Sequence, residues 1–298
     1  FFFHAQAGIP DPLWSRGLGD VYKRQGLYCV ATPIGNMGDI SFRAVKILKD
    51  SDLILCEDTR VTKKILQKFD INKKLISNHK FNEKKNLEKI LKILKNKKIV
   101  SLVSDAGTPA VSDPGRILVK ECVKDKIDIF PVPGASAVSA AISISGFSDS
   151  FYFCGFLPEK QSLIKKLFKN LSSLEASIVF FISPNKLNKR IEDIKEYFLN
   201  RDIIICREIS KYHEEYIRSP VKELSNVNFS RKGEITVIIS EPKNKKLSFN
   251  ELEESDKRKI DQLIKKMSIK DIVKKISEGK QISKKLIYNY CLEKKNEN

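Results

Sequence analysis

The sequence has few of the features of membrane-spanning or disulfide-rich proteins. Its apolar runs, such as residues 176–182, fall far short of the roughly 20 residues that a helix needs to cross a bilayer. Its six cysteines are scattered and none forms a C-x-x-C pair, so we expect small buried side chains in a reducing compartment. Three histidines without ligand spacing give no basis for a zinc site. We therefore predict a cytoplasmic protein without a metal and without membrane contact.

Glycine-rich nucleotide-binding patterns are also missing. Neither the G-x-G-x-x-G fingerprint of dinucleotide-binding folds nor the G-x-x-x-x-G-K-[ST] phosphate loop occurs in the 298 residues. Any ligand site must therefore be sought in other loops.

Charge, by contrast, is strongly of one sign. The chain holds 55 lysines and arginines against 37 aspartates and glutamates, a formal charge of +18. Such a charge favours a polyanionic partner, with nucleic acid first and an anionic membrane surface second. The excess is mostly lysine in a chain also rich in isoleucine and asparagine, and a biased genome explains it equally well.

Residues 1–25 differ from the rest of the chain. They have no periodic apolar pattern, and they contain the only tryptophan, Trp14, among several turn-forming glycines and prolines. They also lack the apolar stretch of 7–15 residues that a signal peptide needs. We expect a non-native or disordered leader that does not contribute to the fold.

From Leu27 onward, short apolar segments alternate with amphipathic ones. The clearest helix is predicted for Asn82–Asn96, where Leu87, Ile90, Leu91 and Leu94 follow the i, i+3, i+4, i+7 spacing. Strands are predicted for residues 27–31, 53–56, 99–103 and 127–131. Strands separated by helices predict a largely parallel sheet with covered faces.

A second series of strands and helices follows. Strands are predicted for residues 151–156, 177–182, 203–206 and 235–239, with a further one near 212–218, and helices for 161–171 and 186–199. The class is therefore α/β. We place an N-terminal α/β domain at 26–147, a C-terminal α/β domain at 148–243 and a basic helical extension at 244–298.

The extension is predicted to form three short helices, at about 252–267, 269–278 and 283–294, with Gly279 ending the second. It holds 15 lysines and arginines against 9 aspartates and glutamates, a net charge of +6. Two interpretations remain open: a helix–turn–helix-like module that binds RNA, and a small docking bundle with solvated lysines.

Three loops carry candidate binding groups at predicted strand ends. Pro33 and Gly35 form a turn after the first strand, in A-T-P-I-G-N (31–36), where a glycine allows close approach of a ligand. The stretch S-D-A-G-T-P (104–109) follows the strand predicted at 99–103 and continues to S-D-P-G (112–115). Its glycines and prolines predict a loop of defined conformation. V-P-G-A-S-A (132–137) precedes a run of small residues. Ligands of open α/β sheets bind beyond the carboxyl ends of the strands.

A fourth segment, C-E-D-T-R (56–60), places three ionisable residues at a strand end. Buried charges need partners, so this cluster indicates a polar site. The alternative is structural: Glu57 or Asp58 forms an ion pair with Arg60 that caps a helix.

In this order and spacing, these motifs resemble the tetrapyrrole methylase superfamily. The resemblance covers about residues 26–292, and single motifs alone would not carry it. The further matches are G-F-L-P (155–158), Arg207-Glu208 with Lys211 and Glu214, and K-G-E (232–234). One stretch departs from the family pattern: after Phe180-Phe181, relatives carry an acidic residue, a histidine and an arginine, whereas residues 182–187 are I-S-P-N-K-L.

The resemblance implies two α/β domains with S-adenosylmethionine (SAM) in the cleft between them, usually in a homodimer. It implies methylation of a cytidine 2′-oxygen in the decoding region of small-subunit (16S) ribosomal RNA, either free or in the assembled subunit. The residues expected to bind the cofactor are Pro33, Gly35, Asp105, Gly107, Thr108, Asp113, Ser136 and Ala137. The catalytic candidates, which the sequence does not rank, are Glu57, Asp58, Arg60, Glu208 and Lys211.

Two other functions remain as alternatives. One is a methylase of a corrin precursor within the same superfamily, which the basic helical extension and the T-P-I-G-N loop disfavour. The other is a non-catalytic RNA-binding protein, which SAM binding would exclude.

Overall fold

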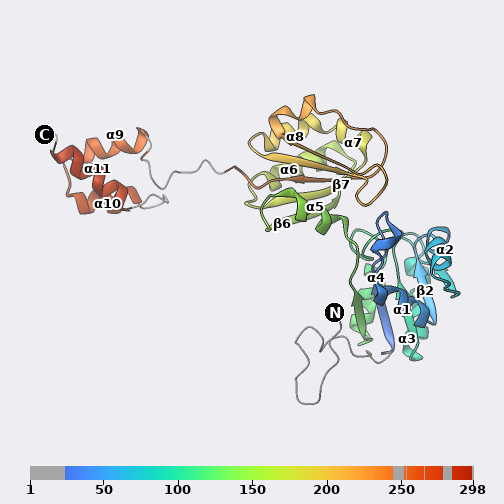
Figure 1. The fold of residues 1–298 in the computed structure, drawn as a ribbon. Coiled ribbons are helices and arrows are strands. Elements are labelled where there is room, and N and C mark those ends of the chain that lie inside the picture. Colours follow the sequence, from blue (N-terminus) through green and yellow to red (C-terminus); the bar gives the residue numbers. More distant parts are fainter. Residues whose placement is uncertain (1–23, 244–251, 253, 265, 278–283, 297–298) are drawn as a thin grey trace, which may run out of the picture. The chain divides into compact units, whose positions relative to one another are not determined.

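A computed structural model of the chain describes residues 24–243, 252, 254–264, 266–277 and 284–296 (Figure 1). The chain divides into two compact units, residues 1–240 and 241–298. The leader expected at residues 1–25 lies outside the described residues except for Arg24 and Gln25, and so does Gly279.

The first unit begins with a sheet of five parallel strands in the order β3-β2-β4-β1-β5. The strands are β1 (Gly26–Val30), β2 (Leu53–Cys56), β3 (Leu75–Ser77), β4 (Ile99–Leu102) and β5 (Ile129–Val132). The central strands β2 and β4 are buried throughout, which is consistent with their largely apolar sequences, L-I-L-C and I-V-S-L. The edge strand β3 is short and only half-buried, and the sequence analysis did not predict it.

Helices cover both faces of this first sheet. They are α1 (Phe42–Asp50), α2 (Thr59–Lys68), α3 (Glu83–Lys95) and α4 (Arg116–Lys124), with a short 3-10 helix η1 (Met37–Asp39) before α1. Apolar side chains of α1 and α2 pack on one face, and those of α3 and α4 pack on the other. The predicted parallel sheet with covered faces is confirmed.

The second sheet of the same unit is mixed, in the order β6-β7-β10-β8-β9. Its strands are β6 (Phe151–Phe156), β7 (Ser177–Ile182), β8 (Asp202–Arg207), β9 (Glu215–Pro220) and β10 (Ile235–Ile239). Only β6 and β7 are parallel, because the last strand, β10, inserts antiparallel between β7 and β8. A fully buried central strand is consistent with the sequence of β10, I-T-V-I-I.

Helices also cover both faces of the second sheet (Figure 1). One face carries α6 (Gln161–Ser172), α7 (Pro184–Asn188) and α8 (Ile191–Phe198), near a 3-10 helix η2 (Val221–Asn226). The other carries α5 (Ala137–Ser145), which follows β5 in the chain but packs its Ala141 on the second sheet. The single helix predicted at 186–199 is two helices. Arg190 lies between the two helices, and its side chain donates hydrogen bonds to the Glu159 carbonyl and the Asp193 carboxylate.

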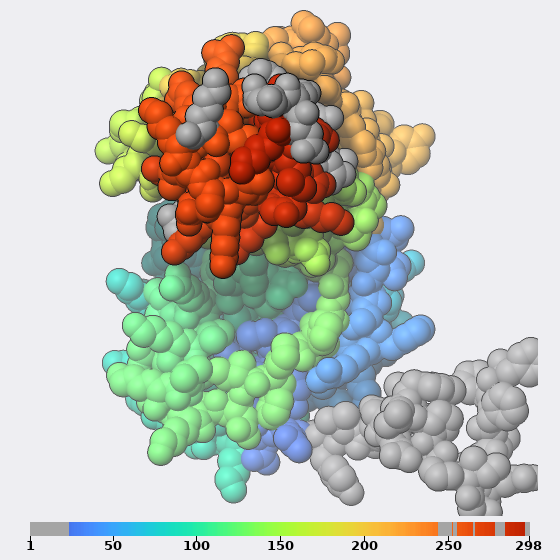
Figure 2. Space-filling model, turned by 90° about the vertical axis from the view of Figure 1, so that its left-hand side faces the viewer, coloured from blue at the N-terminus to red at the C-terminus, as the bar shows by residue number. Residues whose placement is uncertain are grey.

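The second unit contains three helices, α9 (Glu254–Leu263), α10 (Ile269–Ser277) and α11 (Lys284–Asn296). They share an apolar core of their own, which includes Ile260, Ile272 and Ile287. Figure 2 shows the side chains of these helices, in orange to red, packed closely against one another. None of the helices in the described part of the chain has the length and apolarity needed to cross a membrane.

A buried carboxylate holds the start of α4. Glu83, the first residue of α3, is 5% exposed, and its Oε1 accepts from the backbone N–H groups of Gly115, Ile117 and Leu118 at 3.1, 3.1 and 3.2 Å. The helix has no cap of its own, because its N-cap residue is Gly115. Glu83 therefore satisfies the free N–H groups of α4 and places a negative charge at the positive end of the helix.

We predict that Glu83→Gln lowers the free energy of unfolding by about 2 kcal/mol, because a neutral amide oxygen makes weaker hydrogen bonds to the buried N–H groups than a carboxylate and no longer opposes the positive end of the helix. Urea unfolding at neutral pH measures the change. Glu88→Gln is the matched control, since Glu88 lies on the exposed side of the same helix and should change stability by less than about 0.5 kcal/mol. Equal effects of the two substitutions would contradict the capping role.

Candidate functional site

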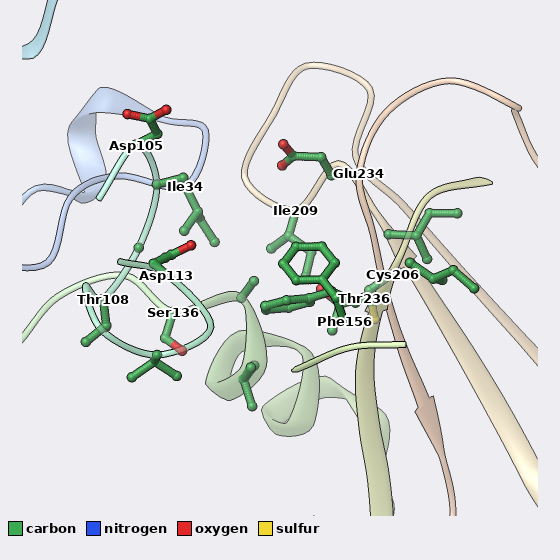
Figure 3. Close-up of a pocket in the computed structure, with 18 of the residues that line it drawn as sticks. Ile34, Asp105, Thr108, Asp113, Ser136, Phe156, Cys206, Ile209, Glu234 and Thr236 are labelled. Atoms are coloured by element: carbon green, nitrogen blue, oxygen red, sulfur yellow. The ribbon is translucent and has the colours of Figure 1, made fainter. Parts of the chain in front are cut away.

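A cavity of about 330 Å³ lies at the carboxyl ends of the first sheet. Figure 3 shows its two walls, with loops of the first sheet on one side and strands of the second sheet on the other. The first wall includes Ile34, Asp105, Thr108 and Ser136, and the second is formed at the ends of β6, β7, β8 and β10. Its volume falls within the range of about 300–1,000 Å³ typical of small-molecule sites.

The loops after β1 and β4 are joined by their backbones. Thr32 donates its N–H to the Gly107 carbonyl at 2.9 Å, and Gly107 donates in return at 3.0 Å. The buried Thr32 hydroxyl donates to the Ser104 carbonyl at 3.0 Å. Gly107 has a φ of 80°, a conformation that favours glycine. The first two sequence motifs therefore form one structural unit at the edge of the cavity.

Six of the eight residues predicted to bind the cofactor line the cavity. They are Asp105, Gly107, Thr108, Asp113, Ser136 and Ala137. Pro33 and Gly35 do not line it. Gly35 instead lies against the Ser210 backbone and the Lys211 side chain, where a Cβ atom would overlap both. The binding roles of all eight residues stay predictions, but the structure brings most of them to one place.

The V-P-G-A-S-A motif has a clear structural role. Gly134 passes so close to Ala31 that a Cβ on it would lie 2.9 Å from the Ala31 Cβ. Ser136 is the N-cap of α5 and accepts from the Ser139 N–H at 3.4 Å. This geometry carries the chain from the first sheet to the helix that packs on the second.

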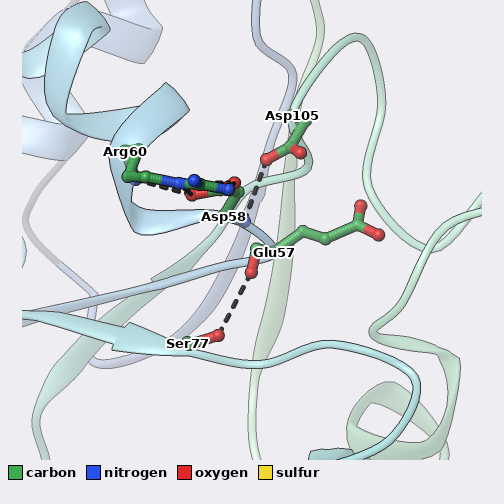
Figure 4. A network of polar contacts seen from close by, with 5 residues as sticks. All are labelled: Glu57, Asp58, Arg60, Ser77 and Asp105. Atoms are coloured by element: carbon green, nitrogen blue, oxygen red, sulfur yellow. Dashed lines mark hydrogen bonds and ion pairs between the residues drawn. The ribbon is translucent and has the colours of Figure 1, made fainter.

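The acidic segment at the end of β2 divides into a paired part and an unpaired part (Figure 4). Asp58 caps α2 and accepts from the Arg60 N–H at 2.8 Å and from the Arg60 guanidinium at 2.6 Å, which holds the pKa of Asp58 near 2. Its own N–H donates to Asp105 Oδ1 at 3.0 Å. The helix-capping ion pair considered as the structural alternative is thus present between Asp58 and Arg60.

Glu57 behaves differently. Its side chain lines the cavity and extends away from Arg60 (Figure 4), and its carboxylate has no hydrogen-bond partner among the described residues. Burial, followed by the nearby Asp105 carboxylate, raises the pKa of Glu57. Burial also raises the pKa of Asp105, and burial with Glu57 raises that of Asp113 to about 6. Three carboxyl groups with raised pKa values therefore face one cavity.

The remaining catalytic candidates form a second charged cluster. Lys211 lines the cavity, and its ammonium donates to Glu208 at 3.1 Å and to Glu234 at 2.9 Å. Burial alone would lower the pKa of Lys211, but the two carboxylates outweigh it and raise the pKa. Glu208 does not line the cavity. Its Oε1 accepts from the Glu234 N–H at 2.8 Å as well as from Lys211, so Glu208 holds the Lys211 side chain next to the start of β10.

The apolar residues of the second wall were not among the predicted site residues. Phe156 is 65% exposed, and its ring lies 5.3 Å from that of Phe181, which also lines the cavity. Ile209 and Thr236 also belong to this wall. The G-F-L-P match contained Phe156, but nothing in the sequence shows which strand ends of the second sheet meet the first.

Known proteins share both the sequence and the fold. The family described as tetrapyrrole (corrin/porphyrin) methylases matches residues 26–225. The ribosomal RNA small subunit methyltransferase I of Mesomycoplasma conjunctivae is 44% identical over 234 residues, which cover 77% of this chain and 97% of that protein. The protein of the same name from Thermotoga maritima is 45% identical, over 72% of this chain and 97% of its own length. The chain belongs to the tetrapyrrole methylase family, in its ribosomal RNA small subunit methyltransferase I group.

Solved structures of tetrapyrrole methylase-like proteins confirm the two-sheet architecture. A diphthine synthase has a TM-score of 0.58 at 15% identity and covers 72% of this chain and 89% of its own. A uroporphyrin-III C-methyl transferase from Thermus thermophilus, solved in complex with S-adenyl homocysteine, has a TM-score of 0.52 at 14% identity over 72% of this chain and 97% of its own. At such low identity these structures show the fold alone.

We predict that Asp113 makes stability depend on pH. Its pKa of about 6 in the folded protein is above the value of about 3.9 for an ordinary Asp, so the folded state binds the proton more tightly. Its contribution is therefore fully present below about pH 4 and is lost as the pH rises to about 6. Asp113→Asn should remove this loss and stabilise the protein by about 1–3 kcal/mol more at pH 8 than at pH 4.

Urea unfolding of both proteins at the two pH values measures this difference. Asp149→Asn, at an exposed aspartate, is the control and should show no such pH dependence. The prediction fails if Asp113→Asn has the same effect at pH 4 and pH 8.

Proposed function

We propose that this protein transfers a methyl group from SAM to the 2′-oxygen of a cytidine ribose in the decoding region of small-subunit (16S) ribosomal RNA. The observation that carries the proposal is the identity of 40–45% to several proteins named ribosomal RNA small subunit methyltransferase I. The cavity and its charges support it. We further propose that the protein acts as a homodimer in the cytoplasm.

The chemistry of the cavity fits this cofactor. SAM supplies an electrophilic methyl group on a positively charged sulfur. Asp105, Asp113 and Glu57 give the cavity a negative lining, which favours a cation, while apolar groups such as Ile34 and Phe181 suit a flat ring. Backbone groups of Gly107 and Thr108 are held in place by the bridge to Thr32 and can orient polar atoms of the ligand.

Among the catalytic candidates, Glu57 is best placed to act on a proton. A ribose hydroxyl is a poor nucleophile near neutral pH, so a positioned base assists its attack. Asp58 and Arg60 bind each other, and Glu208 and Lys211 are joined in a second cluster. Glu57 lines the cavity with an unbonded carboxylate and a raised pKa, which makes it a stronger base than an ordinary glutamate.

The alternative functions have weaker support. The solved precorrin and uroporphyrin methyltransferases are 13–19% identical to this chain, so they support a common fold and not a common substrate. A non-catalytic RNA-binding protein would not need the cavity with its three carboxyl groups.

The test of this function is the mapping of methylated riboses. Purified protein, SAM and small-subunit rRNA, supplied free and in assembled subunits, should yield one 2′-O-methylated cytidine in the decoding region, detected by resistance to alkaline cleavage. In the same assay, Glu57→Gln should lower kcat at least tenfold, the loss expected when a general base is removed. The affinity for SAM, measured by calorimetry, should change little in comparison.

Two outcomes would contradict parts of this proposal. If the protein does not bind SAM, the proposed methyltransferase activity is wrong and the non-catalytic alternative is favoured. A Glu57→Gln variant with normal kcat would leave the reaction in place but reject Glu57 as the base. Arg60→Lys is a useful control, because Arg60 lies outside the cavity lining and is 87% exposed at its side chain.

The C-terminal extension (residues 244–298) is proposed to bind RNA through phosphates. Four of its lysines, Lys274, Lys275, Lys284 and Lys285, are exposed on α10 and α11. The described part of the extension contains none of the residues that line the cavity.

Replacing these four lysines by glutamine should therefore weaken RNA binding and leave SAM affinity unchanged. Because phosphate contacts release counterions, the slope of log K against log salt should become shallower by about 1–3. RNA affinity at two salt concentrations measures both effects. If the extension is instead a docking bundle with solvated lysines, affinity and slope will stay the same, while deletion of the extension will lower the melting temperature or dissociate a dimer.

A further inference from the structure

Two exposed aromatic pairs flank the cavity, one from each sheet. Tyr212 and His213 lie in the loop between β8 and β9, with ring centroids 5.0 Å apart and an interplanar angle of 81°. His79 and Phe81 lie in the loop between β3 and α3, with centroids 6.0 Å apart at 66°. Tyr212 is 96% exposed and Phe81 is 92% exposed. Neither side chain contributes to the core of the protein.

The Tyr212–His213 pair is directly connected to the cavity. The preceding residue, Lys211, lines the cavity, as does Ile209. The Ser210 hydroxyl hydrogen-bonds the Asp39 carboxylate, so this loop of the second sheet is held against the loop that follows β1. The pair therefore stands beside the cavity at the point where the loops of the two sheets meet.

The backbone of this loop is held in an unusual conformation. Glu208 and Ser210 have φ values of 51° and 66°, in the left-handed region that non-glycine residues rarely adopt. Hydrogen bonds from Lys211 N–H to the Glu208 carbonyl at 2.9 Å and from Glu214 N–H to the Lys211 carbonyl at 3.1 Å maintain it. Such strain persists only where surrounding contacts enforce it, and it is concentrated at functional sites. The loop therefore holds the Tyr212 ring in an exposed position.

The His79–Phe81 pair is held in a similar way. The Asn82 side chain accepts from the His79 N–H at 2.7 Å and donates to the Ser77 carbonyl at 3.1 Å. The loop follows β3, the parallel neighbour of β2, so it lies at the same edge of the sheet as Glu57. This pair therefore stands on the Glu57 side of the cavity.

We infer that these two pairs are stacking platforms for unpaired RNA bases on either side of the methylated nucleotide. Single-stranded RNA is recognised by stacking of splayed bases on aromatic side chains, and rings exposed to this degree are otherwise unfavourable in water. The net charge of +18 provides attraction for the phosphates. The inference rests on the proposed function, since it assigns RNA to the same site.

Stacking makes a specific prediction for binding. Tyr212→Ala and Phe81→Ala should each weaken the affinity for a short single-stranded oligoribonucleotide of mixed sequence by roughly tenfold, the usual effect of losing one stacked base. Tyr212→Phe should bind normally, because it keeps the ring. SAM affinity and melting temperature should not change in any of the three variants. Tyr152→Ala is the matched control, since Tyr152 is a 49% exposed tyrosine near the opposite end of β6 from the cavity.

A fluorescence measurement tests stacking directly. Trp14 is the only tryptophan of the chain, so the full-length protein provides the background signal. In Tyr212→Trp and Phe81→Trp, the fluorescence of the added tryptophan should be quenched when the single-stranded oligoribonucleotide binds. In Tyr152→Trp, the added tryptophan should keep its fluorescence, so that RNA changes the signal no more than it changes that of the wild-type protein. The same strand paired in a duplex should quench much less, because its bases are no longer free to stack.

The outcomes separate this inference from the proposed function. Normal affinity of both alanine variants, or no quenching in the tryptophan variants, would overturn the platforms even if the wild-type protein methylates rRNA. A change of oligomeric state in Tyr212→Ala without loss of RNA affinity would overturn them as well and assign the ring to an interface between copies. Loss of RNA affinity in a protein that methylates no rRNA would support the platforms and reject the methyl transfer.

Discussion

The pair of backbone hydrogen bonds between Thr32 and Gly107 is the contact on which the site depends. It joins the loops after β1 and β4, two neighbouring strands of the first sheet, and the buried Thr32 hydroxyl adds a third bond to Ser104. The far end of the second loop is held by Glu83, which caps α4 at Gly115. A loop fixed at both ends presents its carboxylates and amides without having to order them when a ligand binds, which lowers the entropic cost of binding.

The charged groups of the site divide into ion pairs at the rim and carboxyl groups without an ion pair that face the cavity. Asp58 with Arg60, and Lys211 with Glu208 and Glu234, satisfy each other at the rim. Glu57, Asp105 and Asp113, which also face the cavity, have no ion pair of this kind among the described residues, and burial raises their pKa values. A positive ligand would relieve their mutual repulsion, so the same feature that weakens the protein at high pH prepares the cavity for a cation.

Local sequence predicted most elements because each has a strong periodicity or an unbroken apolar run. The strands β2, β6, β7 and β10 begin and end at the predicted residues. The three-residue edge strand β3 was not predicted, since it is too short to show alternation and is only half-buried. The break between α7 and α8 was not predicted either, because it depends on contacts of Arg190 with Glu159, which is remote in sequence. The roles of the site residues stay predictions.

The sequence by itself determined the α/β class, the order of the elements and the loops that form the first wall of the cavity. These follow from local patterns and from the rule that ligands bind at the carboxyl ends of parallel strands. Only the tertiary structure decided that α5 crosses to the second sheet, that β10 inserts between β7 and β8, and that Phe156 and Phe181 form the second wall. It also separated Glu57 from the paired Asp58 and Arg60. These are contacts between residues far apart in the chain, and periodicity contains no information about which distant surfaces pack together.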